Sequence, residues 1–345
     1  MLQTMLKERS IPPLLSREEM LEILAREEYG RMPPPPDAMT WTVEENCYNN
    51  FCAGKALLSK VHLTCTVGQR SFTFPFYCSI PTAPGKHPFF IHVNFRDCVP
   101  DIYMPTEEII DSGFAILSFC YNDVTRDNRD FTDGLAGVFF PDGKRNAEDP
   151  GKISLWAWAA QRVMDYAMTL DCLDPDRSIV CGHSRLGKTA LWTAATDERF
   201  RFVYSNDSGC SGAAISRGKD GEQVWQIWKQ FPFWFCENYR KYAEDLDSMP
   251  FDQHYLLASI APRFVFVGSA EDDEWAGPVS EFLCCAAASP AWEAAGLPGF
   301  RCEDRLPQPG DLFSDGTVGY HMRSGPHYFS RLDWQKCITF INKHS

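Results

Sequence analysis

No stretch of the 345-residue sequence approaches the roughly 20 consecutive apolar residues that a membrane-spanning helix needs. The first ten residues, MLQTMLKERS, contain no long apolar run, so we expect no secretory signal peptide. The chain also lacks internal repeats, low-complexity tracts and any Cys-x-x-Cys pair. These absences argue against membrane-spanning proteins, metal-finger proteins and proteins with a redox motif.

Positive charge is also scarce. The sequence has 33 Lys and Arg against 46 Asp and Glu, which gives a formal net charge of −13. Nucleic acids and anionic membranes bind clustered positive charge, so we expect neither as a partner. No feature of the sequence points to an obligate protein partner.

The 14 cysteines are scattered, and several, such as Cys120 and Cys181, lie inside apolar runs. Cysteines in this setting are typical of small core residues that stay reduced, whereas a disulfide framework needs an oxidising compartment. We therefore expect a cytoplasmic protein. A hydrophobic content of 44% is enough to fill a sizeable core.

Strands and helices alternate along most of the chain, which indicates a parallel sheet with crossover helices. The predicted strands are 89–93, 113–119, 178–181, 202–205 and 264–268, and the predicted helices are 105–112, 153–170, 186–196 and 332–344. The predicted fold class is α/β, a mainly parallel central sheet with helices on both faces in a three-layer sandwich. Nothing in the sequence suggests a linker, so we expect one domain over residues 1–345.

Two N-terminal segments precede this pattern. Residues 1–36 are expected to form a helical extension, with a helix from a capping box at Ser16–Glu19 to about Tyr29. Residues 41–80 alternate apolar and polar side chains and predict antiparallel strands at the edge of the same sheet. The segment 127–150, rich in Asp, Gly and Asn, is expected to be a surface loop that lines a binding cleft.

The segment 179–191, IVCGHSRLGKTAL, predicts a buried strand, a tight turn and a helix, with Ser184 at the apex. This arrangement is typical of a nucleophilic serine whose neighbouring amides face a developing negative charge. Residues 182–189 also fit the phosphate-binding pattern G-x-x-x-x-G-K-T. A P-loop is a remote alternative for three reasons. Arg185 and Leu186 are bulky, the segment lies past the middle of the chain, and no base-recognition motif follows it.

A nucleophilic serine needs a histidine to take its proton and a carboxylate to hold that histidine. In α/β-hydrolases the acid and then the histidine follow the serine. Asp273 follows the strand predicted at 264–268, and His327 precedes the last helix. Asp272 competes with Asp273, and His321 competes with His327, although the neighbours of His321 suggest a packed position.

Five separated motifs resemble the glucuronoyl esterases, carbohydrate esterase family 15. They are residues 182–188, 205–214, 261–263, 273–276, and 319–327 together with Asp333 and Trp334. The resemblance covers roughly residues 85–345 and implies an α/β-hydrolase fold. Members of this family cleave esters between 4-O-methyl-glucuronic acid on xylan and alcohols, including lignin alcohols.

The resemblance also implies roles for individual residues. Ser184 would be the nucleophile, His327 the general base, and Arg185 the group that stabilises the oxyanion. Members of the family place the triad acid in either of two positions, here Asp207 and Asp273; we favour Asp273, with Asp207 as a second or alternate acid. The residues implied in sugar binding are Lys188 and Glu222, which would bind hydroxyls, and Trp275, which would pack on the ring.

The sequence therefore predicts a serine carboxylic ester hydrolase. It would act through an acyl-enzyme on uronic acid (4-O-methyl-glucuronoyl) esters of plant-cell-wall oligosaccharides, with no metal and no organic cofactor. A carbohydrate O-acetyl (xylan) esterase and a non-catalytic sugar-binding relative remain as alternatives. The alcohol portion, the sugar length and the oligomeric state stay open.

Overall fold

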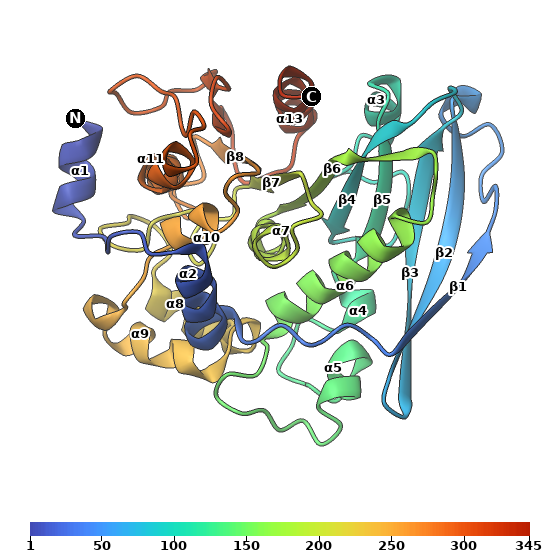
Figure 1. The fold of residues 1–345 in the computed structure, drawn as a ribbon, viewed down its shortest axis with the longest axis horizontal. Coiled ribbons are helices and arrows are strands. Elements are labelled where there is room, and N and C mark those ends of the chain that lie inside the picture. The colour runs from blue at the N-terminus through green and yellow to red at the C-terminus, as the bar shows by residue number, and fades with distance from the viewer.

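A single ten-stranded sheet runs through the computed structural model, which describes residues 1–345 (Figure 1). The order of the strands across the sheet is β1-β2-β3-β5-β4-β6-β7-β8-β10-β9. The strands are β1 (Ala38–Glu44), β2 (Ala56–Val67), β3 (Arg70–Pro81), β4 (His87–Asn94), β5 (Ala115–Cys120), β6 (Leu173–His183), β7 (Phe202–Asn206), β8 (Phe264–Ala270), β9 (Leu312–Phe313) and β10 (Val318–Arg323).

Thirteen α-helices accompany the sheet. They are α1 (Leu2–Glu8), α2 (Arg17–Leu24), α3 (Thr106–Asp111), α4 (Tyr121–Val124), α5 (Gly134–Phe139), α6 (Lys152–Ala167), α7 (Arg185–Thr196), α8 (Val224–Gln230), α9 (Arg240–Glu244), α10 (His254–Ala258), α11 (Pro278–Ala288), α12 (Pro290–Ala294) and α13 (Arg331–Lys343). None of them combines the length and the apolar character that crossing a bilayer would require.

The six central strands, from β5 through β4, β6, β7 and β8 to β10, are parallel to their neighbours. Strands β1, β2 and β3 are antiparallel and form one edge of the sheet, and β9 pairs antiparallel with β10 at the other. The predicted mainly parallel α/β sheet is thus confirmed. Parallel strands end at the same edge of the sheet, so the loops after β6, β7, β8 and β10 gather there.

Helices cover both faces of the sheet, as predicted. On one face α6, α7, α10 and α11 pack over a core cluster of 74 buried residues, and on the other α3 and α13 enclose a cluster of 16 (Figure 1). Helix α6 is buried along nearly its whole length because it lies between the sheet and the N-terminal segment. The difference in cluster size makes the α6–α7 face the main core.

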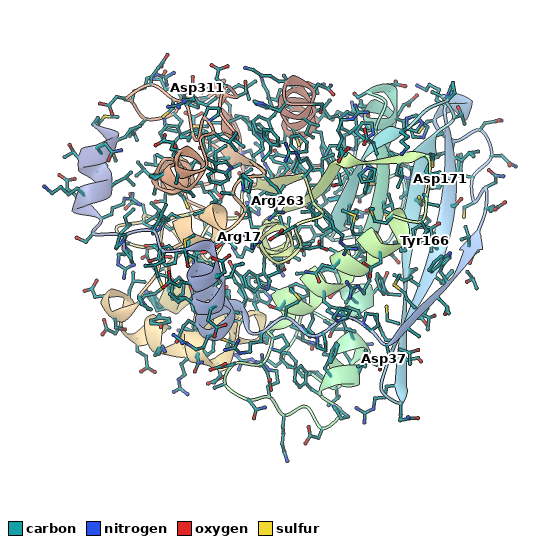
Figure 2. All side chains as sticks on the ribbon, viewed as in Figure 1. Arg17, Asp37, Tyr166, Asp171, Arg263 and Asp311 are labelled. Atoms are coloured by element: carbon teal, nitrogen blue, oxygen red, sulfur yellow. The ribbon has the colours of Figure 1, made fainter.

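Two arginines fix the C-terminal end of α7, the helix that begins directly after Ser184. The Arg17 guanidinium donates to the carbonyl of Ala195 at 3.1 Å, and that of Arg263 donates to the carbonyl of Ala194 at 2.7 Å (both arginines are labelled in Figure 2). Guanidinium groups there satisfy carbonyls that lack helical partners and oppose the negative end of the helix dipole. The two contacts hold α7, and with it the serine turn, from the far end.

Three local predictions can be compared with the structure. The capping box is present: the Glu19 amide donates to Ser16 Oγ at 3.3 Å, and the helix continues through a π-helical turn to Tyr29. The prediction of a long surface loop over 127–150 is wrong for residues 134–139, because α5 forms there around buried Leu135 and Ala136. Strands β9 and β10 were missed; β9 has only two residues, and β10 mixes Gly, His and Arg with apolar residues and shows no alternation.

The N-terminal segment is joined to the rest of the protein through Glu28, which is completely buried. Its carboxylate accepts hydrogen bonds from the Gln253 side-chain amide at 3.0 and 3.1 Å, and its carbonyl accepts from the amide of Cys236 at 2.9 Å. No basic side chain is paired with this carboxyl group, so burial raises its pKa from 4.5 to about 8.

This pKa predicts a pH-dependent stability. Below about pH 4.5 Glu28 is protonated in both states; between pH 4.5 and 8 only the unfolded state loses the proton, so the free energy of unfolding falls as pH rises. One such group contributes up to about 1.4 kcal/mol per pH unit. Urea unfolding of Glu28→Gln should show a shallower fall over this range. An identical pH slope in Glu28→Gln and the unsubstituted protein would contradict the assignment.

Candidate active site

Ser184 occupies a strained turn between β6 and α7, with φ 57° and ψ −128°. A side chain on Gly182 would place its Cβ 2.2 Å from the Leu186 carbonyl oxygen, and one on Gly187 would place it 3.0 Å from Ser208 Cβ. The Ser184 amide donates to the Asn206 carbonyl at 2.8 Å, which ties the turn to β7. The two glycines therefore let the chain turn tightly enough to present the serine at its apex.

This geometry argues against a P-loop. In a P-loop the residues between the two glycines form an open loop that wraps a phosphate with its amides. Here α7 begins at Arg185, so the second glycine, Gly187, lies inside the helix. The segment is a serine turn of the hydrolase type.

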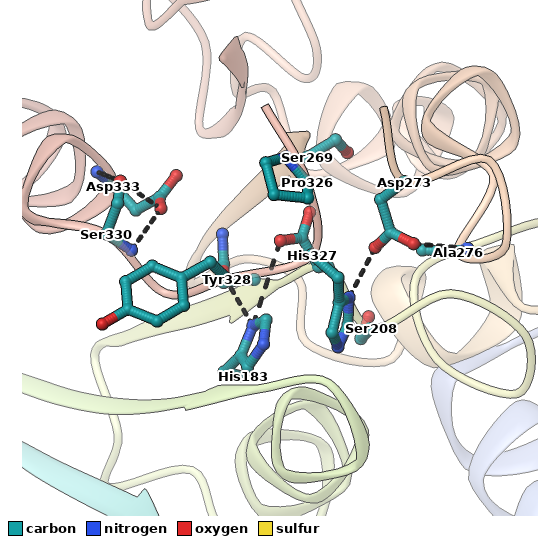
Figure 3. A network of polar contacts seen from close by, with 12 residues as sticks. His183, Ser208, Ser269, Asp273, Ala276, Pro326, His327, Tyr328, Ser330 and Asp333 are labelled. Atoms are coloured by element: carbon teal, nitrogen blue, oxygen red, sulfur yellow. Dashed lines mark hydrogen bonds and ion pairs between the residues drawn. The ribbon is translucent and has the colours of Figure 1, made fainter. Parts of the chain in front are cut away.

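His327 is held by Asp273. The Nδ1 atom of His327 lies 2.6 Å from Oδ2 of Asp273, and the other carboxylate oxygen accepts from the Ala276 amide at 3.2 Å (Figure 3). Asp273 is buried, whereas His327 is partly exposed toward the cavity described below. With Nδ1 donating to Asp273, Nε2 is left to accept a proton.

The loop that carries His327 is fixed by Arg323 at the end of β10. The Arg323 guanidinium donates to the carbonyls of Pro326, at 3.0 Å, and of Tyr328, which flank the histidine. The same guanidinium is paired with Asp333 on α13 at 2.8 Å (Pro326, Tyr328 and Asp333 are labelled in Figure 3). One buried cation therefore holds the histidine loop to the last helix.

Asp207 makes no hydrogen bond with His327. Its carboxylate is buried 3.4 Å from Arg323 Nη2 and 3.9 Å from His183 Nδ1, and its Oδ1 atom has no hydrogen-bond partner. Burial, with Glu281 and other nearby carboxylates, raises the pKa of Asp207 well above its usual range. The geometry therefore pairs His327 with Asp273 and leaves Asp207 beside Arg323.

The competing residues lie elsewhere. Asp272 is exposed, whereas its neighbour Asp273 is buried. His321 is buried within the sheet with Nε2 3.0 Å from the Tyr204 hydroxyl, and burial lowers its pKa to about 4. A further histidine, His254 at the start of α10, is also buried, with Nε2 2.9 Å from the Pro12 carbonyl. Of these three histidines, only His327 lines the same cavity as Ser184.

Arg185 is positioned by Asp127 and an aromatic side chain. Its Nη1 donates a hydrogen bond to Asp127 Oδ2, and its guanidinium carbon lies 4.8 Å from the centre of the Trp234 ring. The indole of Trp234 donates to the other oxygen of Asp127 at 2.6 Å, which fixes that carboxylate in turn. The buried Nε of Arg185 has no partner within the protein. The guanidinium therefore keeps an unused donor.

All eight predicted site residues line one cavity of about 360 Å³. They are Ser184, Arg185, Lys188, Asp207, Glu222, Asp273, Trp275 and His327. The sequence reasoning missed three further lining residues from α8 and the turn after it, namely Gln230, Phe231 and Trp234. The exposed apolar residue at the mouth is Trp275, which is 49% exposed.

Lys188 and Glu222 give the cavity wall one donor and one acceptor. Lys188 is only 4% exposed and donates to the carbonyl of Ser208. Burial lowers its pKa, and the negative charge of Glu222 opposes that shift. The Glu222 amide donates to the carbonyl of Trp275 at 2.9 Å, which holds the acid beside the tryptophan.

One set of side chains at the edge of the cavity resembles a metal-binding cluster. Potential ligand atoms of His183, Asp207 and His327 lie within 4.8 Å of one another. Tetrahedral zinc needs ligands about 3.3 Å apart, and the cation Arg323 already lies against Asp207. The set fits a metal ion poorly.

A larger depression of about 800 Å³ lies elsewhere, between α1 and residues 217–247. Its two arginines are already engaged: Arg9 donates to Ser280 Oγ at 2.7 Å, and Arg217 donates to the Phe251 carbonyl at 2.8 Å. It contains none of the predicted site residues.

The fold and the serine turn define a hydrolase of the α/β class. The family described as "Glucuronyl esterase, fungi" matches residues 63–296. The chain is 37% identical over 240 residues to carbohydrate esterase MZ0003 from an unknown prokaryotic organism, covering 69% of this chain and 55% of that protein. It is 29% identical over 294 residues to a 4-O-methyl-glucuronoyl methylesterase of Podospora anserina, covering 81% of this chain and 56% of that protein.

The solved structures include a glucuronoyl esterase from Solibacter usitatus, with a TM-score of 0.85 and 30% identity over 94% of this chain and 91% of that one. The chain belongs to the glucuronoyl esterase family, carbohydrate esterase family 15. It spans a little over half the length of the first two curated relatives.

The His327–Asp273 contact predicts which acid matters for serine reactivity. Replacing Asp273 by Asn removes the acceptor for Nδ1–H and should slow fluorophosphonate labelling of Ser184 by about 10³–10⁴-fold, as when a triad acid is lost. The matched change Asp207→Asn, which leaves that contact in place, should slow labelling less than about tenfold. If Asp207→Asn slowed labelling more than Asp273→Asn does, the assignment of Asp273 as the partner of His327 would be contradicted.

Proposed function

We propose that the protein is a glucuronoyl esterase that hydrolyses 4-O-methyl-glucuronoyl esters through a covalent acyl-enzyme. The observation that carries this proposal is the placement of Ser184 and the His327–Asp273 pair in one cavity. Membership of the glucuronoyl esterase family supports the substrate class.

The ester chemistry follows from the geometry. Nε2 of His327 takes the proton of Ser184 Oγ as that oxygen bonds to the ester carbonyl carbon. The resulting oxyanion is stabilised by the backbone N–H of Arg185 and by its guanidinium, which Asp127 holds at the cavity. His327 then gives its proton to the departing alkoxide, and the alcohol leaves. Water deprotonated by His327 attacks the acyl carbon; the bond to Ser184 Oγ then breaks, His327 returns the proton to that oxygen, and the uronic acid leaves.

Three other lining residues are suited to binding a sugar ring. The Lys188 ammonium can donate to a hydroxyl oxygen, and the Glu222 carboxylate can accept from a hydroxyl hydrogen. Together they can bind two hydroxyl groups on neighbouring carbons of the sugar. Trp275 presents a largely exposed ring that can pack against the sugar's C–H face. A few placed polar groups in a cavity of this size are typical of a small-molecule site.

The nucleophile gives the direct test of the proposal. Ser184→Ala should lower the turnover of methyl glucuronate by at least about 10³-fold, because the acyl-enzyme cannot form. Circular dichroism of the variant should match that of the unsubstituted protein. Preference for acetylated xylose over methyl glucuronate in the unsubstituted enzyme would instead indicate an O-acetyl esterase, and no labelling of Ser184 would indicate a sugar-binding protein.

The Arg185–Asp127 contact predicts a kcat effect. Arg185→Ala should lower kcat for methyl glucuronate by about 10²–10³-fold, the loss typical of an oxyanion donor. Asp127→Asn, which loosens Arg185 without removing it, should lower kcat about tenfold and change KM less than threefold, because the oxyanion exists only after attack. Steady-state kinetics measure both; a rise in KM at unchanged kcat would contradict this role.

We also propose that the protein acts in the cytoplasm. The support is that all 14 cysteines are free thiols in the structure, and that nine of them are buried. A reducing compartment keeps such thiols unpaired. Cell fractionation that finds the protein in an oxidising compartment would contradict the proposal.

A further inference from the structure

Glu281 is a fully buried acid on α11 that the ester chemistry does not use. Its two carboxylate oxygens contact different parts of the active-site wall. One accepts from the Gly209 amide at 2.8 Å, in the segment after β7, and the other accepts from Ser269 Oγ at 2.5 Å, on β8. Glu281 has no hydrogen bond with Ser184, His327 or Asp273.

The peptide group between Ser208 and Gly209 is held at both ends. Its N–H donates to the Glu281 carboxylate, and its carbonyl oxygen accepts from the Lys188 ammonium. The buried side chains of Glu281 and Lys188 therefore hold the two ends of one buried peptide group, its N–H and its carbonyl oxygen. Hydrogen bonds to charged groups contribute more stability than those between neutral groups.

The segment that contains this peptide group has a conformation that needs support. Asp207 and Ser211 have φ values of 45° and 54°, which are unfavourable for residues other than glycine. Gly209 has φ 60° and leaves no room for a side chain, because a Cβ there would lie 2.9 Å from the Cα of Ala276. Asp207, Ser208 and Gly209 all line the cavity. Strained backbone persists only where surrounding contacts over-determine it.

We propose that Glu281 is a positioning residue for sugar recognition: by holding the Ser208–Gly209 peptide, it fixes the Lys188 ammonium at the cavity wall. The inference rests on the proposed function, in which Lys188 binds the sugar hydroxyls. It predicts that Glu281 affects the binding of the uronate and leaves the ester chemistry at Ser184 nearly untouched.

Two substitutions separate hydrogen bonding from charge. Burial raises the pKa of Glu281 to about 7, and its protonated form can still accept from Gly209 while donating to Ser269. Glu281→Gln has the same pattern, since its amide oxygen accepts and its NH₂ donates. Glu281→Ala removes both contacts and leaves the buried Gly209 N–H without an acceptor.

Steady-state kinetics of the full chain test the inference with methyl glucuronate and, as an ester without a sugar, p-nitrophenyl acetate. Glu281→Ala should raise KM for methyl glucuronate about tenfold with kcat within threefold, and should change kcat/KM for p-nitrophenyl acetate less than twofold. Glu281→Gln should stay within threefold of the unsubstituted enzyme on both substrates. Equal losses on the two substrates, or no loss on either, would overturn the proposal.

A double substitution tests the route through Lys188. If Glu281 acts by holding Lys188, adding Glu281→Ala to Lys188→Ala should lower kcat/KM for methyl glucuronate by less than a further twofold. Effects that multiply in the double variant would overturn this route. Ser269→Ala removes one of the two hydrogen bonds that hold Glu281 and should raise KM for methyl glucuronate about threefold. This variant replaces Glu281→Ala in the test if Glu281→Ala does not fold.

Hydrogen exchange of residues 205–214 provides a readout that needs no substrate. Exchange in this segment should be faster in Glu281→Ala and unchanged in Glu281→Gln; unchanged exchange in Glu281→Ala would refute the hold of Glu281 on this peptide group. An unsubstituted protein that does not turn over methyl glucuronate, while the exchange behaves as expected, would refute the proposed function and leave that hold standing.

Discussion

Ser184 is held in a backbone conformation that an L-residue adopts at a free-energy cost of about 1–3 kcal/mol, and the rest of the site depends on this turn. Contacts from both sides offset the cost. The amide of the serine is tied to β7, the far end of α7 is fixed by Arg17 and Arg263, and Gly182 allows the chain to pass close to the helix. The serine is therefore held in place by the fold itself, so the proposed ester chemistry would need no reorganisation to present it.

The other groups reach the serine because parallel strands end at one edge of the sheet. Asp207 follows β7, Asp273 follows β8 and His327 follows β10. Two of these loops are held by buried ionisable side chains: Glu281 holds the loop after β7, and Arg323 holds the loop after β10 through the carbonyls beside His327. Buried charges of this kind persist because each is fully hydrogen-bonded, so breaking one partner removes more than a single contact. The site is thus supported from behind by buried ionisable side chains that do not line the cavity.

Much of this arrangement could be predicted from the sequence. The glycine-bounded turn at Ser184 and the order of acid and histidine after it are local signals, and the alternation of strands and helices implies a parallel sheet. The choice between Asp207 and Asp273 could not be predicted, because both follow ends of adjacent strands and only the path of each loop decides which meets His327. The sequence placed Asp127 in a segment expected to line a cleft, but the roles of Asp127, Trp234 and Glu281 could not be predicted. These roles depend on contacts between residues 58 to 107 positions apart in the chain.

The central claim is that Ser184, His327 and Asp273 converge into one proton-transfer pathway. A crystal structure of the protein after reaction with a fluorophosphonate measures this directly. We expect phosphorus bonded to Ser184 Oγ, Nε2 of His327 within about 3.2 Å of Oγ or joined to it by one water, and Nδ1 still hydrogen-bonded to Asp273. Phosphorus on another side chain, or His327 beyond the reach of a single bridging water, would contradict it.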